Sequence, residues 1–246
     1  MMDEFIKYCE KQYNIQQGCP TIQVGTLAYY RKMDPAFSIA DSTEQSEKTI
    51  IESFNTTNAP KNVIDHLSTL HIEGGNNNIF ENCTQEIFFP NSLIYCLSTN
   101  TGGDHLENAK RLDPKYDSFY KISNINAFAA QLTYLIFENF KMDWFDEGIQ
   151  IHSLTISDLQ KVRLVSIHKP VLYVDSKTAT IKNNQLTSSS PLESIYHRIV
   201  FTKGKEYINN REYRLLFAFF HPDIGVLPVK TSPIILSLSS LARWLV

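Results

Sequence analysis

The sequence predicts an α+β fold in a single domain over residues 1–246, with mixed, mostly antiparallel sheets and a few packed helices. Hydrophobic residues make up 43% and aromatic residues 12% of the 246 residues, which is enough to bury a sizeable core. Short runs rich in β-branched and aromatic residues recur along the chain, whereas helical periodicity is clear in one long segment. The sequence shows no internal repeat and no linker rich in Pro, Gly or Ser.

The first third of the chain predicts a helix followed by strands. Residues 3–16 indicate a short helix, because apolar residues fall near one face at helical spacing, and Gly18-Cys19-Pro20 ends it. Thr21–Arg31 is typical of a strand, with Gly25 as an irregularity. Ser38–Glu47 is expected to be a loop, and Lys48–Phe54 a further short strand.

The middle of the chain predicts two strand pieces and one long helix. Glu86–Ser98 is divided by Pro90-Asn91, and its second piece, Ser92–Ser98, is apolar enough to be an internal strand. Asn124–Phe140 is the clearest helix, and Ser123 or Asn124 can cap it. Its apolar stripe consists of Phe128, Leu132, Leu135, Ile136 and Phe140.

The last third predicts mostly strands, with a short helix at Leu192–Arg198. The expected strands are Ile149–Ile156, Val162–His168, Val171–Asp175, Ile199–Lys203, Glu212–Phe220, Ile224–Lys230 and Pro233–Leu238. In Glu212–Phe220, alternation places Tyr213, Leu215, Phe217 and Phe219 on one face and Glu212, Arg214, Leu216, Ala218 and Phe220 on the other. Glu212 and Arg214 either line a cleft or form an exposed ion pair at a sheet edge, and this stretch alone favours the exposed pair.

Composition excludes several classes of function. The net charge of −3 gives no electrostatic footprint for duplex DNA. No window approaches the roughly 20 apolar residues of a membrane span. Four cysteines without a Cys-x-x-Cys pair, and no signal peptide ahead of them, predict free thiols and a cytoplasmic location. The seven histidines lie far apart, so no metal site is expected.

Polar residues interrupt the ends of three predicted strands in the order Arg31, Ser98, Glu212. Around them stand Thr26-Leu27-Ala28-Tyr29-Tyr30-Arg31, Asp41-x-x-Glu44, Ile94-Tyr95-Cys96-Leu97-Ser98 and Glu212-Tyr213-Arg214-Leu215. These motifs resemble a bacterial, defence-associated family with GTL-x-YYR, D-x-x-EG, S-x-CFS and E-x-EYRL in this order. The chain departs from that pattern at Gln45, where Gly is usual, and at Asn210, where an acidic residue is common.

The same order more distantly resembles the Arg–Ser–Glu pattern of ADP-ribosyltransferases. That resemblance implies that Arg31 contacts the phosphates or ribose of NAD, that Ser98 braces the nicotinamide side, and that Glu212 is catalytic. Aromatic rings could stack on the nicotinamide, and a guanidinium can bind phosphate oxygens. The remaining cofactor-binding candidates are accordingly Tyr29, Tyr30, Phe119 and Arg214.

Two hypotheses follow. The first is an enzyme that consumes NAD as a substrate, without a metal, and acts as a toxin-like or phage-defence effector. Its partners would be a macromolecular acceptor, protein or nucleic acid, and an antitoxin or defence-system protein. The second is a non-catalytic recognition or sensor module of a bacterial defence system. Convergence of Arg31, Ser98 and Glu212 in space would favour the enzyme.

Overall fold

The computed structural model describes residues 4–33, 46–69, 78–145, 154–187 and 195–238. They fall into two compact units, each built from segments that are distant in sequence. Unit 1 comprises Met1–Ser42, Pro90–Val171 and Tyr207–Val246, and unit 2 comprises Thr43–Phe89 and Leu172–Glu206. The α+β class is confirmed, and most strand pairs are antiparallel. One domain over residues 1–246 stays a prediction, and the two units are described separately below.

Unit 1 contains an eight-stranded sheet whose central path runs β13-β12-β5-β1-β6. On this path β7 also pairs with β12, β2 pairs with β5, and β14 pairs with β2. The strands are β1 (Phe5–Cys9), β2 (Thr21–Thr26), β5 (Leu93–Thr99), β6 (Ser118–Ile122), β7 (Arg163–Pro170), β12 (Glu212–His221), β13 (Gly225–Leu227) and β14 (Ile234–Ser237).

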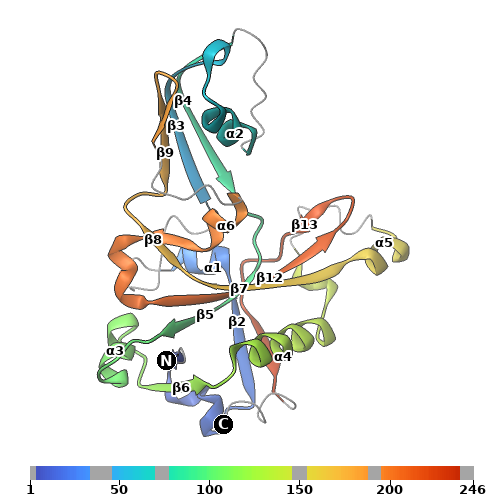
Figure 1. Cartoon of the computed structure of the whole chain (residues 1–246). Helices are drawn as coiled ribbons and strands as arrows, with labels where there is room; N and C mark the ends of the chain where they lie inside the picture. The colour runs from blue at the N-terminus through green and yellow to red at the C-terminus, as the bar shows by residue number, and fades with distance from the viewer. Residues whose placement is uncertain (1–3, 34–45, 70–77, 146–153, 188–194, 239–246) are drawn as a thin grey trace. The chain divides into compact units, whose positions relative to one another are not determined.

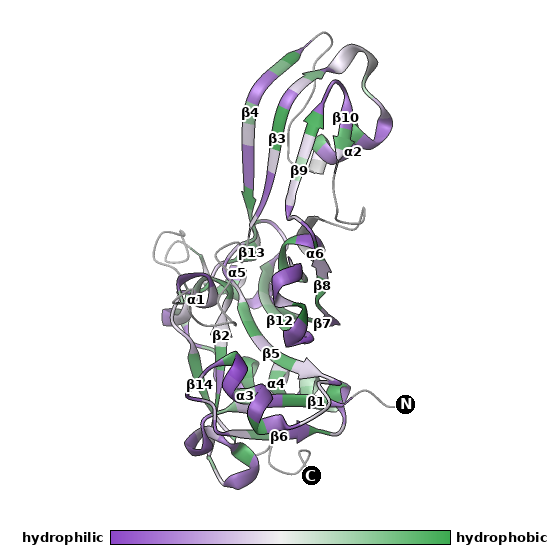
Figure 2. Ribbon diagram, turned by 90° about the vertical axis from the view of Figure 1, so that its left-hand side faces the viewer, coloured by the Kyte–Doolittle hydropathy of each residue, from purple (hydrophilic) through white to green (hydrophobic). Residues whose placement is uncertain are grey.

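Helices cover both faces of this sheet. On one face lies α4 (Ile125–Glu138) (Figure 1). It buries four residues of the expected apolar stripe, whereas Phe140 lies beyond the end of the helix and is partly buried. The Asn124 side chain accepts the amide of Ala127 at the N-terminus. On the other face α3 (His105–Leu112) packs its few apolar residues against β1, while the rest of the helix is hydrophilic (Figure 2). The shorter helices of unit 1 are α1 (Leu27–Lys32) and α5 (Ile156–Lys161).

The alternation predicted for β12 is confirmed. Leu215, Phe217 and Phe219 belong to the main hydrophobic core, and Tyr213 packs against that core. Glu212 and Arg214 lie on the opposite face, where both side chains are buried. An exposed pair at a sheet edge is therefore wrong, because β12 is an inner strand that pairs with β5 on one side and with β7 on the other.

The helix predicted for residues 3–16 is wrong. The segment forms β1 followed by two single-turn 3-10 helices, Lys11–Tyr13 and Ile15–Gln17. Both faces of β1 are buried, so its apolar residues form a nearly continuous run, and such a run cannot be distinguished from a buried helix by periodicity alone.

Other predicted element boundaries also differ from those in the structure. The strand predicted for Thr21–Arg31 ends at Thr26, whose hydroxyl accepts the amide of Tyr29 and begins α1. The run Ile199–Lys203 is divided between α6 (Ile195–Val200) and β11 (Thr202–Gly204). Most of the strand predicted for Ile149–Ile156 lies outside the described residues, and Ile156 is the first residue of α5. Most of the loop predicted for Ser38–Glu47 also lies outside them.

Unit 2 contains a four-stranded sheet of order β10-β9-β3-β4 and a parallel pair of β8 with β11. A bidentate ion pair between Arg198 and Glu47 is buried in it, with contacts of 2.8 and 3.0 Å. Its remaining elements are β3 (Ser46–Asn55), α2 (Lys61–Thr69), β4 (Ile79–Phe88), β8 (Leu172–Val174), β9 (Thr178–Lys182) and β10 (Gln185–Thr187). A 3-10 turn at Thr56–Asn58 belongs to unit 2 and one at Met142–Trp144 to unit 1, while that at Lys205–Asn210 continues from unit 2 into unit 1.

Candidate functional site: a tyrosine-lined pocket at a fork in the sheet

Strand β5 is paired differently along its two edges. On one edge it pairs with β12 from Leu93 to Ser98. On the other edge β2 pairs only with Leu93 and Ile94, and β1 pairs only with Ser98 and Thr99. Among the described strands, therefore, none pairs with the residues 95–97 on that edge. The two neighbouring strands diverge there and leave a fork in the sheet.

A pocket of about 510 Å³ occupies this fork. This volume lies within the range of small-molecule sites, roughly 300–1,000 Å³. Its walls come from β1, β2, β5, α1, the segment leading into β6, and β6. Seven of the lining residues are tyrosines: Tyr8, Tyr13, Tyr29, Tyr30, Tyr95, Tyr116 and Tyr120. Such a lining offers aromatic faces for stacking and hydroxyl groups for hydrogen bonds.

The first turn of α1 places two of these tyrosines. Besides the Thr26 cap, the side-chain oxygen of Asn91 accepts the amide of Ala28 at 2.8 Å, which fixes the start of the helix. The rings of Tyr29 and Tyr30 then meet edge to face, with centroids 5.5 Å apart. A Cβ atom on Gly25 would lie 2.8 Å from the ring of Tyr30, so this ring position requires glycine on β2.

The inner tyrosines keep their protons at neutral pH. Burial raises the pKa of Tyr30 and of Tyr95 well above the usual value, and it also raises the pKa of Tyr116 and Tyr120. The hydroxyl groups of Tyr95 and Tyr120 hydrogen-bond to each other. The wall of the pocket therefore presents neutral phenols rather than phenolates.

Lys7 on β1 brings a cation to the floor of the fork. Its ammonium donates to the carbonyl oxygen of Cys96 at 2.9 Å and lies 4.6 Å from the ring centroid of Tyr95. Burial lowers the pKa of Lys7, while the Cys96 and Cys9 thiols and the Glu212 carboxylate act in the opposite direction. No carboxylate of the described part of the chain lies within ion-pair distance of this ammonium.

Ser98 and Glu212 are brought together. They are direct register partners on β5 and β12, and both are buried. The guanidinium of Arg214 donates to the Glu212 carboxylate at 2.7 Å, with side-chain exposures of 1% and 9%. Glu212 does not line the pocket, but its charge contributes to the raised pKa of Tyr30, which does. The carboxylate therefore lies near the pocket without lining it, and it is held by Arg214.

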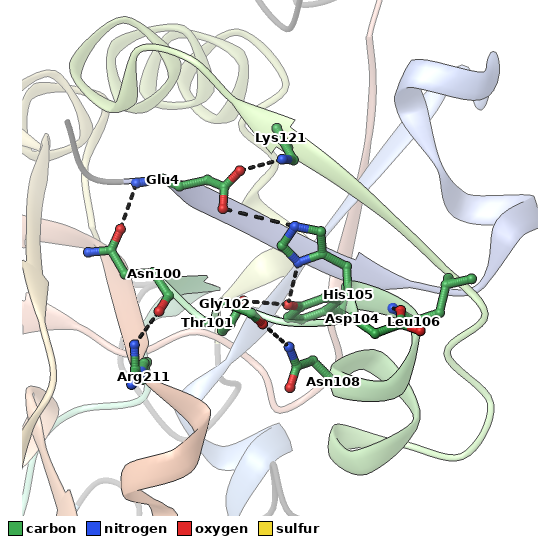
Figure 3. Close-up of polar contacts among 11 residues, drawn as sticks. Glu4, Asn100, Thr101, Gly102, Asp104, His105, Leu106, Asn108, Lys121 and Arg211 are labelled. Atoms are coloured by element: carbon green, nitrogen blue, oxygen red, sulfur yellow. Dashed lines mark hydrogen bonds and ion pairs between the residues drawn. The ribbon is translucent and has the colours of Figure 1, made fainter. Parts of the chain in front are cut away.

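A strained turn sets the start of β12 and so positions Glu212. Arg211 adopts a left-handed conformation with φ of 43°, which is unfavourable for a residue with a side chain. The amide of Thr99 donates to the Arg211 carbonyl at 2.8 Å, and the Arg211 guanidinium donates to the Asn100 carbonyl. The side chain of Asn100 in turn accepts the amide of Glu4 (Figure 3). These contacts tie the ends of β1, β5 and β12 together beside Ser98.

The other predicted cofactor-binding residues, Arg31 and Phe119, do not line the pocket. Arg31 is half-buried on α1, so its placement at the end of a strand is wrong. Phe119 does not line the pocket. Its ring packs on that of His105, with centroids 4.7 Å apart, next to α3. Asp41 and Glu44 of the motif lie outside the described residues. Of the predicted set, Tyr29 and Tyr30 line the pocket, and Ser98, Glu212 and Arg214 cluster beside it.

Four residues of the pocket were not predicted from the sequence as site residues, namely Lys7, Tyr95, Tyr116 and Tyr120. Helical spacing places Lys7 on a solvated face, and only the strand assignment turns it toward the sheet. Tyr95 stands in the middle of a predicted internal strand, where it reads as core. The signal that was available is the high content of tyrosine, 12 residues in the chain.

None of the described helices is long and apolar enough to cross a membrane. No group of three or more His, Cys, Asp or Glu side chains in the described segments could hold a metal ion. Comparisons with protein-family models, with curated protein sequences and with solved structures found no match.

Proposed function

We propose that the protein is an ADP-ribosyltransferase that consumes NAD, with the fork pocket receiving the dinucleotide. The observation that carries the proposal is that Ser98 and Glu212 stand opposite each other on adjacent strands, beside a pocket lined by Tyr29 and Tyr30. Strand pairing thus joins two of the three residues that the Arg–Ser–Glu resemblance singled out, although they are far apart in sequence.

The chemistry requires a fixed negative charge. When the bond between nicotinamide and ribose breaks, nicotinamide leaves with the bonding electrons and positive charge develops on the sugar. The acceptor's nucleophile then bonds to the same carbon and releases its proton. A preorganised carboxylate stabilises that charge best in a site sheltered from water. Arg214 holds the Glu212 carboxylate in one orientation, and the tyrosine rings suit stacking on nicotinamide.

The acceptor is a protein or a nucleic acid, and the activity suits a toxin-like effector of phage defence held in check by a partner protein. This part of the proposal rests on the family resemblance of the motifs. The pocket, in contrast, bears on the binding of NAD.

The test is release of nicotinamide from NAD, measured by chromatography with and without a cell lysate as the source of acceptor. Glu212→Gln keeps the shape of the side chain and removes its charge, so turnover should fall by about two orders of magnitude or more. Glu47→Gln is the matched control, because Glu47 is also buried and paired with an arginine but belongs to unit 2. Equal losses in both variants, in proportion to the fraction unfolded, would contradict a catalytic Glu212.

One observation favours a second candidate, the non-catalytic recognition module. The Glu212–Arg214 pair is as buried as the purely internal Glu47–Arg198 pair, which suits a structural role. In that case the wild type releases no nicotinamide above the level of buffer alone, with lysate or without it, and Glu212→Gln lowers the melting temperature while ligand binding per folded molecule stays intact.

A further inference from the structure

Lys7 is a cation without a compensating anion. An ammonium removed from water is costly unless an opposite charge or several acceptors surround it. The carbonyl of Cys96 and the ring of Tyr95 are the contacts that the described residues offer. The nearby Glu212 carboxylate is already held by Arg214, so that pair is neutral as a unit. The Lys7 ammonium therefore forms no ion pair with a carboxylate of the described residues.

Two carboxylates and a second lysine also line the pocket, but the contacts of the carboxylates are with other groups than Lys7. Glu10 accepts from the side chain of Gln12 at 2.9 Å, and Asp113 accepts the backbone amide of Lys115 at the same distance. Both carboxylates are thus engaged by local donors of their own segments. Of the two lysines that line the pocket, Lys115 is exposed, whereas Lys7 is half-buried.

We infer that the fork pocket binds a ligand that combines an aromatic ring with a phosphate group, a nucleoside diphosphate being the simplest, and that Lys7 is the residue that binds the phosphate. An ammonium has three donors, of which one goes to Cys96, so donors remain for an anion. Charge-assisted bonds from lysine to phosphate are among the stronger polar contacts in proteins. The tyrosine rings around it supply the stacking surface for the base.

This inference assigns to Lys7 the phosphate-binding role that the resemblance gave to Arg31. It rests on the proposed function for the identity of the dinucleotide as NAD, but the pocket and its cation are independent of any turnover. An anion at this position also favours the protonated amine, which burial alone disfavours.

The experiment is calorimetric titration of the full chain with ADP and, separately, with adenosine. Lys7→Met keeps an unbranched stem and removes the charge, and should weaken ADP binding about tenfold or more, the effect of losing a hydrogen bond to a charged group. It should leave adenosine binding within about twofold, because stacking is unchanged. Lys121→Met is the matched control, because Lys121 lies on the neighbouring strand β6 without lining the pocket, and this variant should bind ADP as the wild type does.

A chemical probe covers the case in which Lys7→Met fails to fold. Pyridoxal 5′-phosphate carries a ring, a phosphate and an aldehyde, and its imine with a nearby lysine amine forms with loss of water and is fixed by borohydride. Peptide mass spectrometry of the treated wild type should find Lys7 modified, and ADP should protect it. Labelling that is spread over the exposed lysines and insensitive to ADP would overturn the inference, as would a folded Lys7→Met that binds ADP with the affinity of the wild type.

The outcomes separate this inference from the proposed function. Loss of ADP binding in Lys7→Met together with no release of nicotinamide by the wild type would uphold the pocket and refute the enzyme. Turnover of NAD with a KM unchanged in Lys7→Met would uphold the enzyme and refute the role of Lys7.

Discussion

Replacing Arg214 by methionine should destabilise unit 1 strongly. The guanidinium is 1% exposed and lies 2.7 Å from the Glu212 carboxylate, so its removal leaves a buried negative charge without its partner. Breaking one side of a buried pair costs about 3–5 kcal/mol, whereas an exposed pair contributes at most about 1 kcal/mol. At roughly 2–4 °C per kcal/mol for a chain of this length, the melting temperature should fall by about 6–20 °C.

The assay is thermal and urea unfolding followed by tryptophan fluorescence, to which Trp144, packed against the core of unit 1, contributes as one of two tryptophans in the chain. Lys121→Met is the control, because Lys121 pairs with Glu4 on the same sheet but is half exposed. The unfolding midpoint of Lys121→Met should therefore stay close to that of the wild type. The double variant Glu212→Leu with Arg214→Met removes both charges and should recover most of the loss.

A midpoint for Arg214→Met within about 1 kcal/mol of the wild type would refute this reasoning. It would mean that Glu212 reaches water or another cation when Arg214 is absent, so that the pair is not the buried unit described above. No recovery in the double variant would instead show that packing of the long arginine stem, rather than charge, is what stabilises this face of β12.

Three further outcomes follow from packing and burial. Leu132→Ala should cost about 2–5 kcal/mol in urea unfolding, because this side chain is wholly buried on α4, and an unchanged midpoint would contradict its core position. Gly25→Ala should displace the ring of Tyr30 and so weaken ADP binding in calorimetry. An unchanged ADP affinity would contradict this and would mean that the position of the ring does not matter for binding. Burial first, and Arg198 second, lower the pKa of His66 to about 4, so the unfolded chain binds a proton that the native state excludes. Stability should therefore fall as the pH drops from about 6.5 toward 4, less in His66→Leu, and parallel pH profiles of wild type and variant would refute the assignment.

The elements that could be predicted from the sequence are those whose pattern is long and one-sided. On α4, apolar residues recur at helical spacing over several turns, and Asn124 marks its start. Strand β12 alternates between an aromatic face and a face that begins with charges, which settles which side chains enter the core. In both elements the apolar residues of the face that enters the core recur with a period that identifies the element.

The elements that could not be predicted are those whose neighbours decide the outcome. β1 is covered on both faces, so its short apolar run carries no period that separates strand from helix. The sequence Thr21–Arg31 has strand propensity throughout, yet the side-chain oxygens of Thr26 and of the distant Asn91 accept backbone amides and begin a helix after Thr26. Tertiary contacts override propensity at such points.

The pocket arises from pairing and not from any local motif. It exists because β1 and β2 each pair with only one end of β5, so that none of the described strands lies beside the middle of β5 on that edge. A carbonyl in that position needs a donor, since unpaired buried backbone groups are costly. Lys7 supplies it at Cys96, and the same contact fixes the ammonium at the floor of the fork. Lys7 thus has two roles: it donates a hydrogen bond to β5 where no described strand pairs on that edge, and it places a positive charge in the pocket. Lys7→Arg keeps a donor and a charge, and should retain ADP binding better than Lys7→Met does.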